Sequence, residues 1–306
     1  MGQLLRRHGI VAGRGLGQHF LCDPRVLGRI VEAAEITAGL PVLEVGPGVG
    51  VLTRALALAG ARVTAVELDR RLRPALLDLL GATLPAHAGV GRPGVEAVCG
   101  GLPCEAIAAG LRICWGDAVR LPWAALAAEE PGPWRVCSNL PYYITGPFLA
   151  SLFEGGLPWS SAVLLVQAQA ADRMAAAPGT KAYGAFTCLV AYHATVERLF
   201  PVGRGAFLPP PSVDSVVIRL RRRSTPPTDA PRVDLLRVIR AAFAQRRKTL
   251  RNALAAGLAA PAATLEAAFV EAGLDGSLRG ERLDLESFGR LTRALLGRGV
   301  SAGARD

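Results

Sequence analysis

The chain has 306 residues, of which 51% are apolar, and it carries a formal net charge of +10. This length and apolar content predict one large domain plus a smaller one with a substantial core. No run of about 20 apolar residues is present to span a bilayer, and the basic N-terminus lacks the apolar stretch of a secretory signal. The charge favours a polyanionic partner, nucleic acid before a membrane surface. An arginine-rich genome would produce the same charge.

The six cysteines show no CxxC pair and no histidine partner at zinc spacing. We therefore expect no metal site, and we expect reduced thiols in a cytoplasmic protein. The six positions are Cys22, Cys99, Cys104, Cys114, Cys137 and Cys188.

The first 18 residues are basic and rich in glycine, which predicts an arm ahead of a helix. That helix is expected to begin at Asp23 and Pro24, because Asp is a favoured N-cap and Pro is favoured in the first turn.

The strongest ligand-binding signal is a strand, a glycine turn, a helix and a second strand. The strand 41–45 enters the turn 46–50, and the strand 61–66 ends at Glu67. This order is typical of nucleotide-binding folds, where an acid about 20 residues after the turn accepts the ribose hydroxyls. The spacing GxGxG without a Walker-type lysine favours S-adenosylmethionine over a dinucleotide. The alternative is a turn that serves chain reversal alone.

A helix is expected over 69–80, and an insertion over about 82–110 is longer than a strand-helix connection requires. Within the insertion, Cys104 to Ala109 reads as a short helix. The third strand, 111–115, is followed by Asp117. Acids at the carboxyl ends of neighbouring parallel strands share one crevice, so Glu67 is expected at the ribose and Asp117 near the adenine amine. The alternative for Asp117 is an N-cap.

The fourth strand, 134–137, ends in Ser138-Asn139-Leu140-Pro141-Tyr142-Tyr143. Hydrogen-bond acceptors beside a flat aromatic surface suit an exocyclic amine on a planar base. We assign the Asn139 side-chain oxygen and the Leu140 carbonyl to hold that amine. Tyr142 would stack on the base, and Phe207 would contact its other face.

Further strands are expected at 162–166, 196–200 and 215–220, with a helix around 186–190. The fold class is therefore α/β, a Rossmann-like sheet that is mostly parallel with an antiparallel end strand. A Pro/Thr-rich linker follows, which divides the chain into an S-adenosylmethionine-binding domain, 1–222, and a small helical domain, 228–306.

The helical domain begins with a helix predicted over 233–254, followed by shorter ones near 262–272, 275–279 and 284–296. Between Arg237 and Arg251 the first of these carries six basic residues and no acid, a better nucleic-acid signal than net charge. A simply solvated helix is the alternative. The residues that we assign to RNA are Arg246, Arg247, Lys248 and Arg251.

Taken together, these motifs resemble the ribosomal RNA adenine dimethyltransferase (KsgA-type) family. The resemblance runs nearly end to end and is most specific in two stretches, 207–215 and 243–252. The chain differs from the family pattern at three points. Position 19 is His where the family often has Asn, position 169 is Gln where Glu is expected, and the insertion is longer than usual.

The resemblance implies S-adenosylmethionine as methyl donor, S-adenosylhomocysteine as product and dimethylation of two adjacent adenosines near the 3′ end of small-subunit rRNA. It implies a cytoplasmic monomer that acts in small-subunit biogenesis. The alternatives are a large-subunit methyltransferase of the antibiotic-resistance type and a non-catalytic nucleic-acid-binding factor. The catalytic assignments are Asn139, Leu140, Pro141, Tyr142 and Phe207, and the cofactor assignments are Gln18, His19, Leu21, Gly46, Gly48, Glu67, Leu68, Asp117, Ala118 and Asn139.

Overall fold

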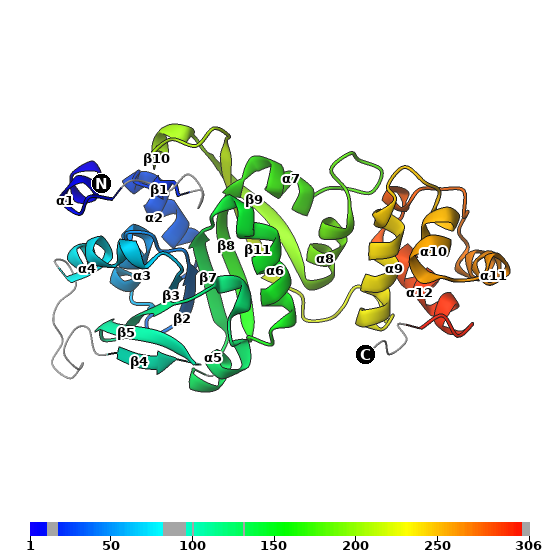
Figure 1. Cartoon of the computed structure of the whole chain (residues 1–306), viewed down its shortest axis with the longest axis horizontal. Coiled ribbons are helices and arrows are strands. Elements are labelled where there is room, and N and C mark those ends of the chain that lie inside the picture. The colour runs from blue at the N-terminus through cyan, green and yellow to red at the C-terminus, as the bar shows by residue number, and fades with distance from the viewer. Residues whose placement is uncertain (11–17, 82–95, 100, 131, 302–306) are drawn as a thin grey trace. The chain divides into compact units, whose positions relative to one another are not determined.

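The computed structural model describes residues 1–10, 18–81, 96–99, 101–130 and 132–301 (Figure 1). Parts of the predicted arm and insertion, 11–17 and 82–95, lie outside the described residues. The chain forms two compact units, Met1–Ala171 with Glu197–Arg222 and Asp172–Val196 with Arg223–Asp306. Residues 172–196 fall inside the predicted first domain, whereas Tyr183 and Cys188 belong to the core of the second unit.

A nine-stranded sheet forms the centre of the first unit, in the order β4-β5-β6-β3-β2-β7-β8-β11-β9 (Figure 1). The pairs of β2 with β3, β3 with β6, β2 with β7 and β7 with β8 are parallel. The strands are β2 (Pro41–Val45), β3 (Arg62–Glu67), β4 (Glu96–Cys99), β5 (Leu102–Ala108), β6 (Leu111–Trp115), β7 (Trp134–Asn139), β8 (Trp159–Gln167), β9 (Ala194–Val202) and β11 (Ser215–Arg222).

The predicted Rossmann-like sheet is confirmed, including the antiparallel pairing of β11 with β8. The chain moves outward from β2 through β3 to β6 and then returns to the other side of β2 with β7. Such a reversal of strand order opens a crevice at the carboxyl ends of the central strands. A separate two-stranded ribbon joins β1 (Phe20–Leu21) to β10 (Phe207–Leu208).

One face of the sheet is covered by helices near the N-terminus. Alternate strand residues such as Val63, Ala65 and Ile113 form a buried core with Ile30 and Leu56 from these helices. The helices of the first unit are α1 (Gly2–Arg7), α2 (Pro24–Ala33), α3 (Val51–Leu58), α4 (Arg73–Gly81), α5 (Trp123–Glu129), α6 (Thr145–Glu154) and α7 (Ala168–Met174), the last of which continues into the second unit.

The described part of the insertion is a hairpin, β4 and β5, that extends the sheet at the edge of β6. The helix predicted over Cys104 to Ala109 is wrong, because this segment is β5. Alanine and glutamate favour a helix weakly, whereas the edge of β6 offers a row of backbone partners.

The expectation that all six cysteines are thiols is also wrong. Cys104 and Cys114 face each other across β5 and β6 and form a disulfide, which leaves Cys22, Cys99, Cys137 and Cys188 free. Strand pairing brought together two cysteines that stand 10 residues apart in the sequence.

The second unit is a helical bundle with its own buried core. The helix predicted over 233–254 is broken into two, because Thr249 caps the second helix by accepting a hydrogen bond from the Asn252 N–H. Residues 275–279 are not helical. Within the described residues no helix is long and apolar enough to cross a membrane. The helices are α8 (Ala185–His193), α9 (Arg232–Ala244), α10 (Leu250–Leu258), α11 (Ala262–Ala272) and α12 (Leu285–Leu296).

Candidate functional site

A cavity of about 390 Å³ lies at the carboxyl ends of the central parallel strands of the first unit. Its volume falls within the range of small-molecule sites. The structure brings together at this cavity all ten residues assigned to the cofactor, and Leu140, Pro141 and Tyr142 of the catalytic set also line it. The ten are Gln18, His19, Leu21, Gly46, Gly48, Glu67, Leu68, Asp117, Ala118 and Asn139.

The glycine turn between β2 and α3 leaves no room for a side chain. Gly48 has φ +60°, and a Cβ added there would lie 3.0 Å from the ring of Phe20. Its N–H donates to Glu67 Oε2 at 3.0 Å, which ties the turn to the end of β3. The Phe20 ring therefore restricts the backbone conformation of the turn, and the hydrogen bond fixes the distance between the turn and the Glu67 carboxylate.

Glu67 is placed to receive hydroxyl donors. It lies at the end of β3 with 6% of its surface exposed, and its other oxygen accepts the Asp69 N–H at 2.8 Å. Burial raises the pKa of this carboxyl, while the N–H groups of Asp69 and Gly48 oppose the rise by stabilising the anion. Each carboxylate oxygen retains a lone pair after these contacts, so two ribose hydroxyls could still donate to Glu67.

Asp117 caps the turn after β6, as the alternative interpretation of this residue expected. Its Oδ1 accepts the Val119 N–H at 2.9 Å. The residue also lines the cavity, so capping and ligand contact are compatible: the cap fixes the carboxylate, and Oδ2 lies only loosely near Arg120, at 3.8 Å.

Asn139 stands at the end of β7 with a defined orientation. Its Nδ2 donates to the His19 carbonyl at 3.1 Å, so its Oδ1 is directed away from that contact as an acceptor. His19 is itself held, because its Nδ1 lies 2.9 Å from the Pro209 carbonyl. The His19 ring stacks beside Tyr142 with 5.9 Å between ring centroids.

Tyr142 follows Asn139 in the short helical turn Tyr142–Ile144, and its hydroxyl lies 2.7 Å from Ser215 Oγ. Burial raises the pKa of this hydroxyl. The ring is therefore anchored at its far end by β11, which leaves its face as a fixed stacking surface beside the Asn139 acceptor.

The structure places Phe207 elsewhere. Its side chain is 3% exposed and packs in the core against the elements around β1, and it does not line the cavity. The three prolines after it stiffen the connection, but the β1–β10 ribbon turns Phe207 inward and leaves its neighbour Leu208 exposed. A base at the cavity would not meet Phe207 in this conformation.

Sequence reasoning missed Glu44, which lines the cavity from within β2 with 1% of its surface exposed. Burial raises the pKa of its carboxyl to about 8. An acid inside the apolar strand 41–45 was the available signal, because a lone carboxyl in a buried strand is rarely there for packing. Phe20 and Tyr143 also line the cavity.

The residues assigned to RNA lie in the second unit, at the break between α9 and α10. Arg246 pairs with Glu281 at 3.0 Å, and Arg251 pairs with Glu266. Arg247 and Lys248 are exposed, and no side chain among the described residues pairs with either of them. Their charges are the ones that remain available to an external anion.

The residues around the cavity are of the kinds that hold a compact cofactor. A side-chain-free glycine turn, a buried carboxylate with spare acceptor capacity and a second acid converge on one cavity. These features fit a nucleoside ligand such as S-adenosylmethionine; the positions of Glu67 at the ribose and of Asp117 near the adenine amine stay predictions. The Asn139 oxygen and the Tyr142 face, on the same cavity, would meet a planar amine from the other side.

The model of the ribosomal RNA adenine dimethylase family matches this chain over residues 12–83 and 119–287. The ribosomal RNA small subunit methyltransferase A of Geobacillus thermodenitrificans is 38% identical over 301 residues, which cover 96% of this chain and 94% of the relative. The enzyme of the same name from Thermobifida fusca is 40% identical over 289 residues, which cover 94% of this chain and 92% of the relative.

Solved structures show the same fold. A dimethyladenosine transferase from Plasmodium falciparum superposes with a TM-score of 0.68 at 24% identity, covering 92% of this chain and 99% of that one. The 23S rRNA methyltransferase ErmE superposes with a TM-score of 0.61 at 26% identity, and the match covers 90% of this chain and 99% of that one.

Proposed function

This chain belongs to the ribosomal RNA adenine dimethylase family, and we propose that it methylates the exocyclic amine of adenine in small-subunit ribosomal RNA. The methyl donor is S-adenosylmethionine. The observation that carries the proposal is the meeting of an oriented amide acceptor and an anchored aromatic face, Asn139 and Tyr142, with the cofactor residues at one cavity.

The chemistry requires positioning more than a strong base. When bound, S-adenosylmethionine supplies a methyl group on a sulfonium, which is an excellent leaving group. The adenine amine is a poor nucleophile because its lone pair is delocalised into the ring. Asn139 Oδ1 and the Leu140 carbonyl would each accept a hydrogen bond from one of its two N–H groups, so that the nitrogen becomes more tetrahedral and turns its lone pair toward the donor.

Tyr142 would stack on the base once the nucleotide has left its helix, a contact worth roughly 1–3 kcal/mol. The Ser215 hydroxyl would keep the ring from rotating away during two successive transfers. Alignment of amine, methyl and sulfur supplies the rest of the rate enhancement.

The second unit would bind rRNA phosphates through Arg247 and Lys248, with Arg246 and Arg251 contributing where RNA competes with their acidic partners. We propose that the substrate is two adjacent adenosines near the 3′ end, within a small subunit in assembly. We further propose that the enzyme acts as a cytoplasmic monomer.

The decisive experiment offers labelled S-adenosylmethionine with three substrates: under-methylated small subunits, free large subunits and DNA. Label is expected in small-subunit rRNA, as dimethyladenosine after nuclease digestion. Label in large-subunit RNA would favour the antibiotic-resistance type of enzyme, and no label on any substrate would favour a non-catalytic binding factor.

The matched variant is Asn139→Ala at saturating cofactor. Loss of one oriented acceptor at the transition state typically lowers kcat by about 10²–10³-fold. Turnover near that of the wild type would refute the role assigned to Asn139, even if the substrate is correct.

A further inference from the structure

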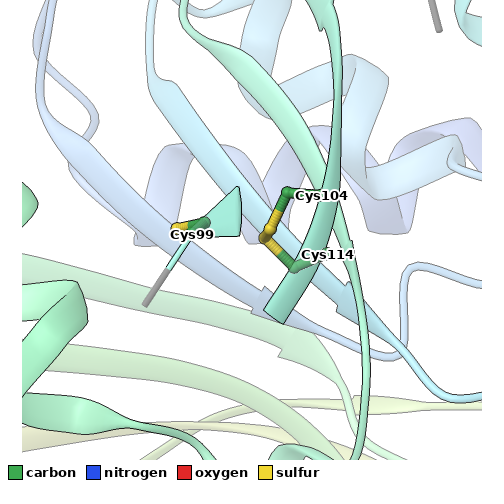
Figure 2. A group of neighbouring side chains, drawn as sticks. All are labelled: Cys99, Cys104 and Cys114. Atoms are coloured by element: carbon green, nitrogen blue, oxygen red, sulfur yellow. A yellow bond between two sulfur atoms is a disulfide. The ribbon is translucent and has the colours of Figure 1, made fainter. Parts of the chain in front are cut away.

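Three cysteines gather on one face of the sheet where the hairpin β4–β5 meets β6 (Figure 2). Cys104 lies directly opposite Cys114, and Cys99 pairs with Leu102, two residues before Cys104. Because side chains alternate along a strand, this register puts all three cysteines on the same face. Their sulfur atoms lie within 4.8 Å of one another, and all three residues are buried.

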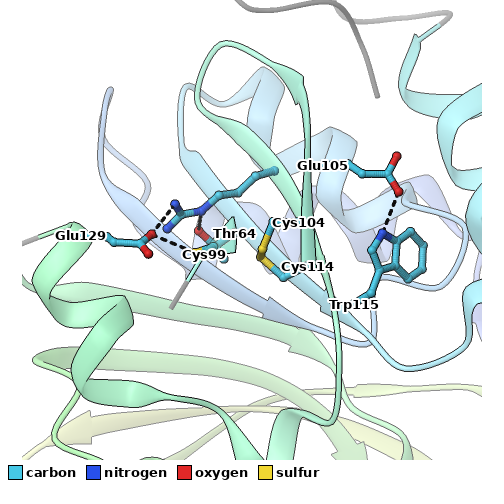
Figure 3. The surroundings of a disulfide bond; sticks show 8 residues. Thr64, Cys99, Cys104, Glu105, Cys114, Trp115 and Glu129 are labelled. Atoms are coloured by element: carbon cyan, nitrogen blue, oxygen red, sulfur yellow. Dashed lines mark hydrogen bonds and ion pairs between the residues drawn. A yellow bond between two sulfur atoms is a disulfide. The ribbon is translucent and has the colours of Figure 1, made fainter. Parts of the chain in front are cut away.

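A carboxylate contacts one member of this group. Glu129, at the end of α5, has its Oε2 2.9 Å from Cys99 Sγ, which donates to it (Figure 3). The same oxygen accepts from Arg112 Nη1 at 2.9 Å, and Arg112 is further fixed by Thr64. Three buried sulfurs thus gather together, and a carboxylate with 35% of its side chain exposed contacts one of them, with a guanidinium beside it.

We propose that in the reduced protein Cys99, Cys104 and Cys114 bind a zinc ion, and that the exposed side chain of Glu129 turns toward them to supply the fourth ligand of a tetrahedral site. Zinc prefers four sulfur, nitrogen or oxygen ligands, and Zn–S bonds of about 2.3 Å put sulfurs roughly 3.8 Å apart, a spacing these sulfurs reach with small shifts. The separation of Cys99 from Cys104 by four residues across a hairpin is also common in structural zinc sites.

The charges support a divalent cation. Three thiolates and a carboxylate with Zn²⁺ would leave the same net charge as a site of four thiolates, which proteins hold routinely. Arg112, in contact with Glu129, offsets a further negative charge. A monovalent cation would leave this buried cluster more strongly charged.

Two of the three cysteines, Cys99 and Cys104, lie in this chain's insertion, and the site adds to the proposed function without depending on it. Cys99, Cys104 and Cys114 all lie between the two stretches that match the family model, 12–83 and 119–287. The hairpin that carries two of them packs close to the cavity, since a Cβ at Gly116, next to Asp117, would meet the Leu102 side chain. Zinc would therefore fix the inserted hairpin against the strand that presents Asp117.

The Cys104–Cys114 disulfide is then the oxidised form of the site. Hydrogen peroxide would take two electrons from the two zinc-bound thiolates and, with two protons, become two waters. The S–S bond forms between Cys104 and Cys114, and Zn²⁺ leaves because only Cys99 and Glu129 remain as ligands.

The test measures zinc on the full-length protein. Protein reduced without oxygen is loaded with zinc, separated from the excess by gel filtration and analysed for metal content. About one zinc per chain is expected, together with its release into a chromogenic chelator, and a mass loss of two hydrogens, when peroxide is added. Cobalt(II) in place of zinc should show a thiolate charge-transfer band.

The informative variant is Cys99→Ser, because it leaves Cys104 and Cys114 in place, so that the oxidised protein can still link β5 to β6. Its zinc affinity should fall at least 10-fold, and Glu129→Gln should weaken binding as well. Cys22→Ser, at a half-buried thiol outside the cluster, is the matched control and should bind like the wild type. Absence of stoichiometric zinc in the reduced wild type, or unchanged binding by Cys99→Ser, would overturn the proposal.

Discussion

Burial of the Glu44 carboxyl should make the free energy of unfolding depend on pH by a predictable amount. In the folded protein its pKa is raised by burial to about 8, against 4.5 for an exposed glutamate. The folded state therefore holds a proton that the unfolded state releases between these two values. The contribution of this proton to the free energy of unfolding is fully present below pH 4.5. It is lost as pH rises toward 8, by about 1.4 kcal/mol per pH unit.

Glu44→Gln keeps the shape of the side chain and removes the titration. Relative to the wild type, the variant should gain roughly 3 to 4 kcal/mol in free energy of unfolding between pH 5 and pH 8. Urea denaturation followed by tryptophan fluorescence is the assay, because all four tryptophans lie in the first unit.

An exposed acid on α2, Glu32, provides the control: Glu32→Gln should follow the wild type across the pH range. If Glu44→Gln and the wild type show the same pH dependence, the carboxyl is ionised in the folded protein, and the argument from burial fails. Other titrating groups are shared by the two proteins, so they cancel in the difference.

Three further predictions concern the site and the RNA surface. Gly48→Ala must strain a backbone at φ +60° and displace the Phe20 ring, so S-adenosylmethionine should bind at least 10-fold more weakly by calorimetry; wild-type affinity would contradict the tight-turn argument. Tyr142→Phe loses its contact with Ser215 but keeps the ring, so methylation should fall less than 10-fold, whereas Tyr142→Ala should lose roughly 1–3 kcal/mol of base binding. Arg247→Glu should weaken rRNA binding and lower its salt slope, and an unchanged slope would place the phosphates elsewhere.

Much of the candidate site follows from local sequence because its residues sit at the ends of predictable elements. A short stretch of chain contains the apolar strand 41–45, the glycine turn and the acid at 67. Their order and spacing in the sequence therefore determine how far apart they lie in the fold. Parallel strands then bring such ends to one edge. For this reason Glu67, Asp117 and Asn139 could be expected at one cavity before any contact was known.

The errors lie where a distant segment decides the outcome. Cys104 to Ala109 has helical preferences, yet it becomes a strand because β6 offers an unpaired edge. Phe207 looks exposed among prolines, yet pairing with β1 turns it into the core. The break in the helix expected over 233–254 has a local cause instead, because Thr249 caps the start of α10.

The amino-acid sequence alone determined the central strands, the cofactor turn and the amide-aromatic motif, because each depends on side chains a few residues apart. Only the tertiary structure showed that Glu44 is buried at the cavity, that Asn139 is oriented by His19 and that Tyr142 is anchored by Ser215. It also brought three cysteines into one cluster and placed Glu129 in contact with Cys99. Strand register and helix packing make these contacts, and no local pattern in the sequence encodes them.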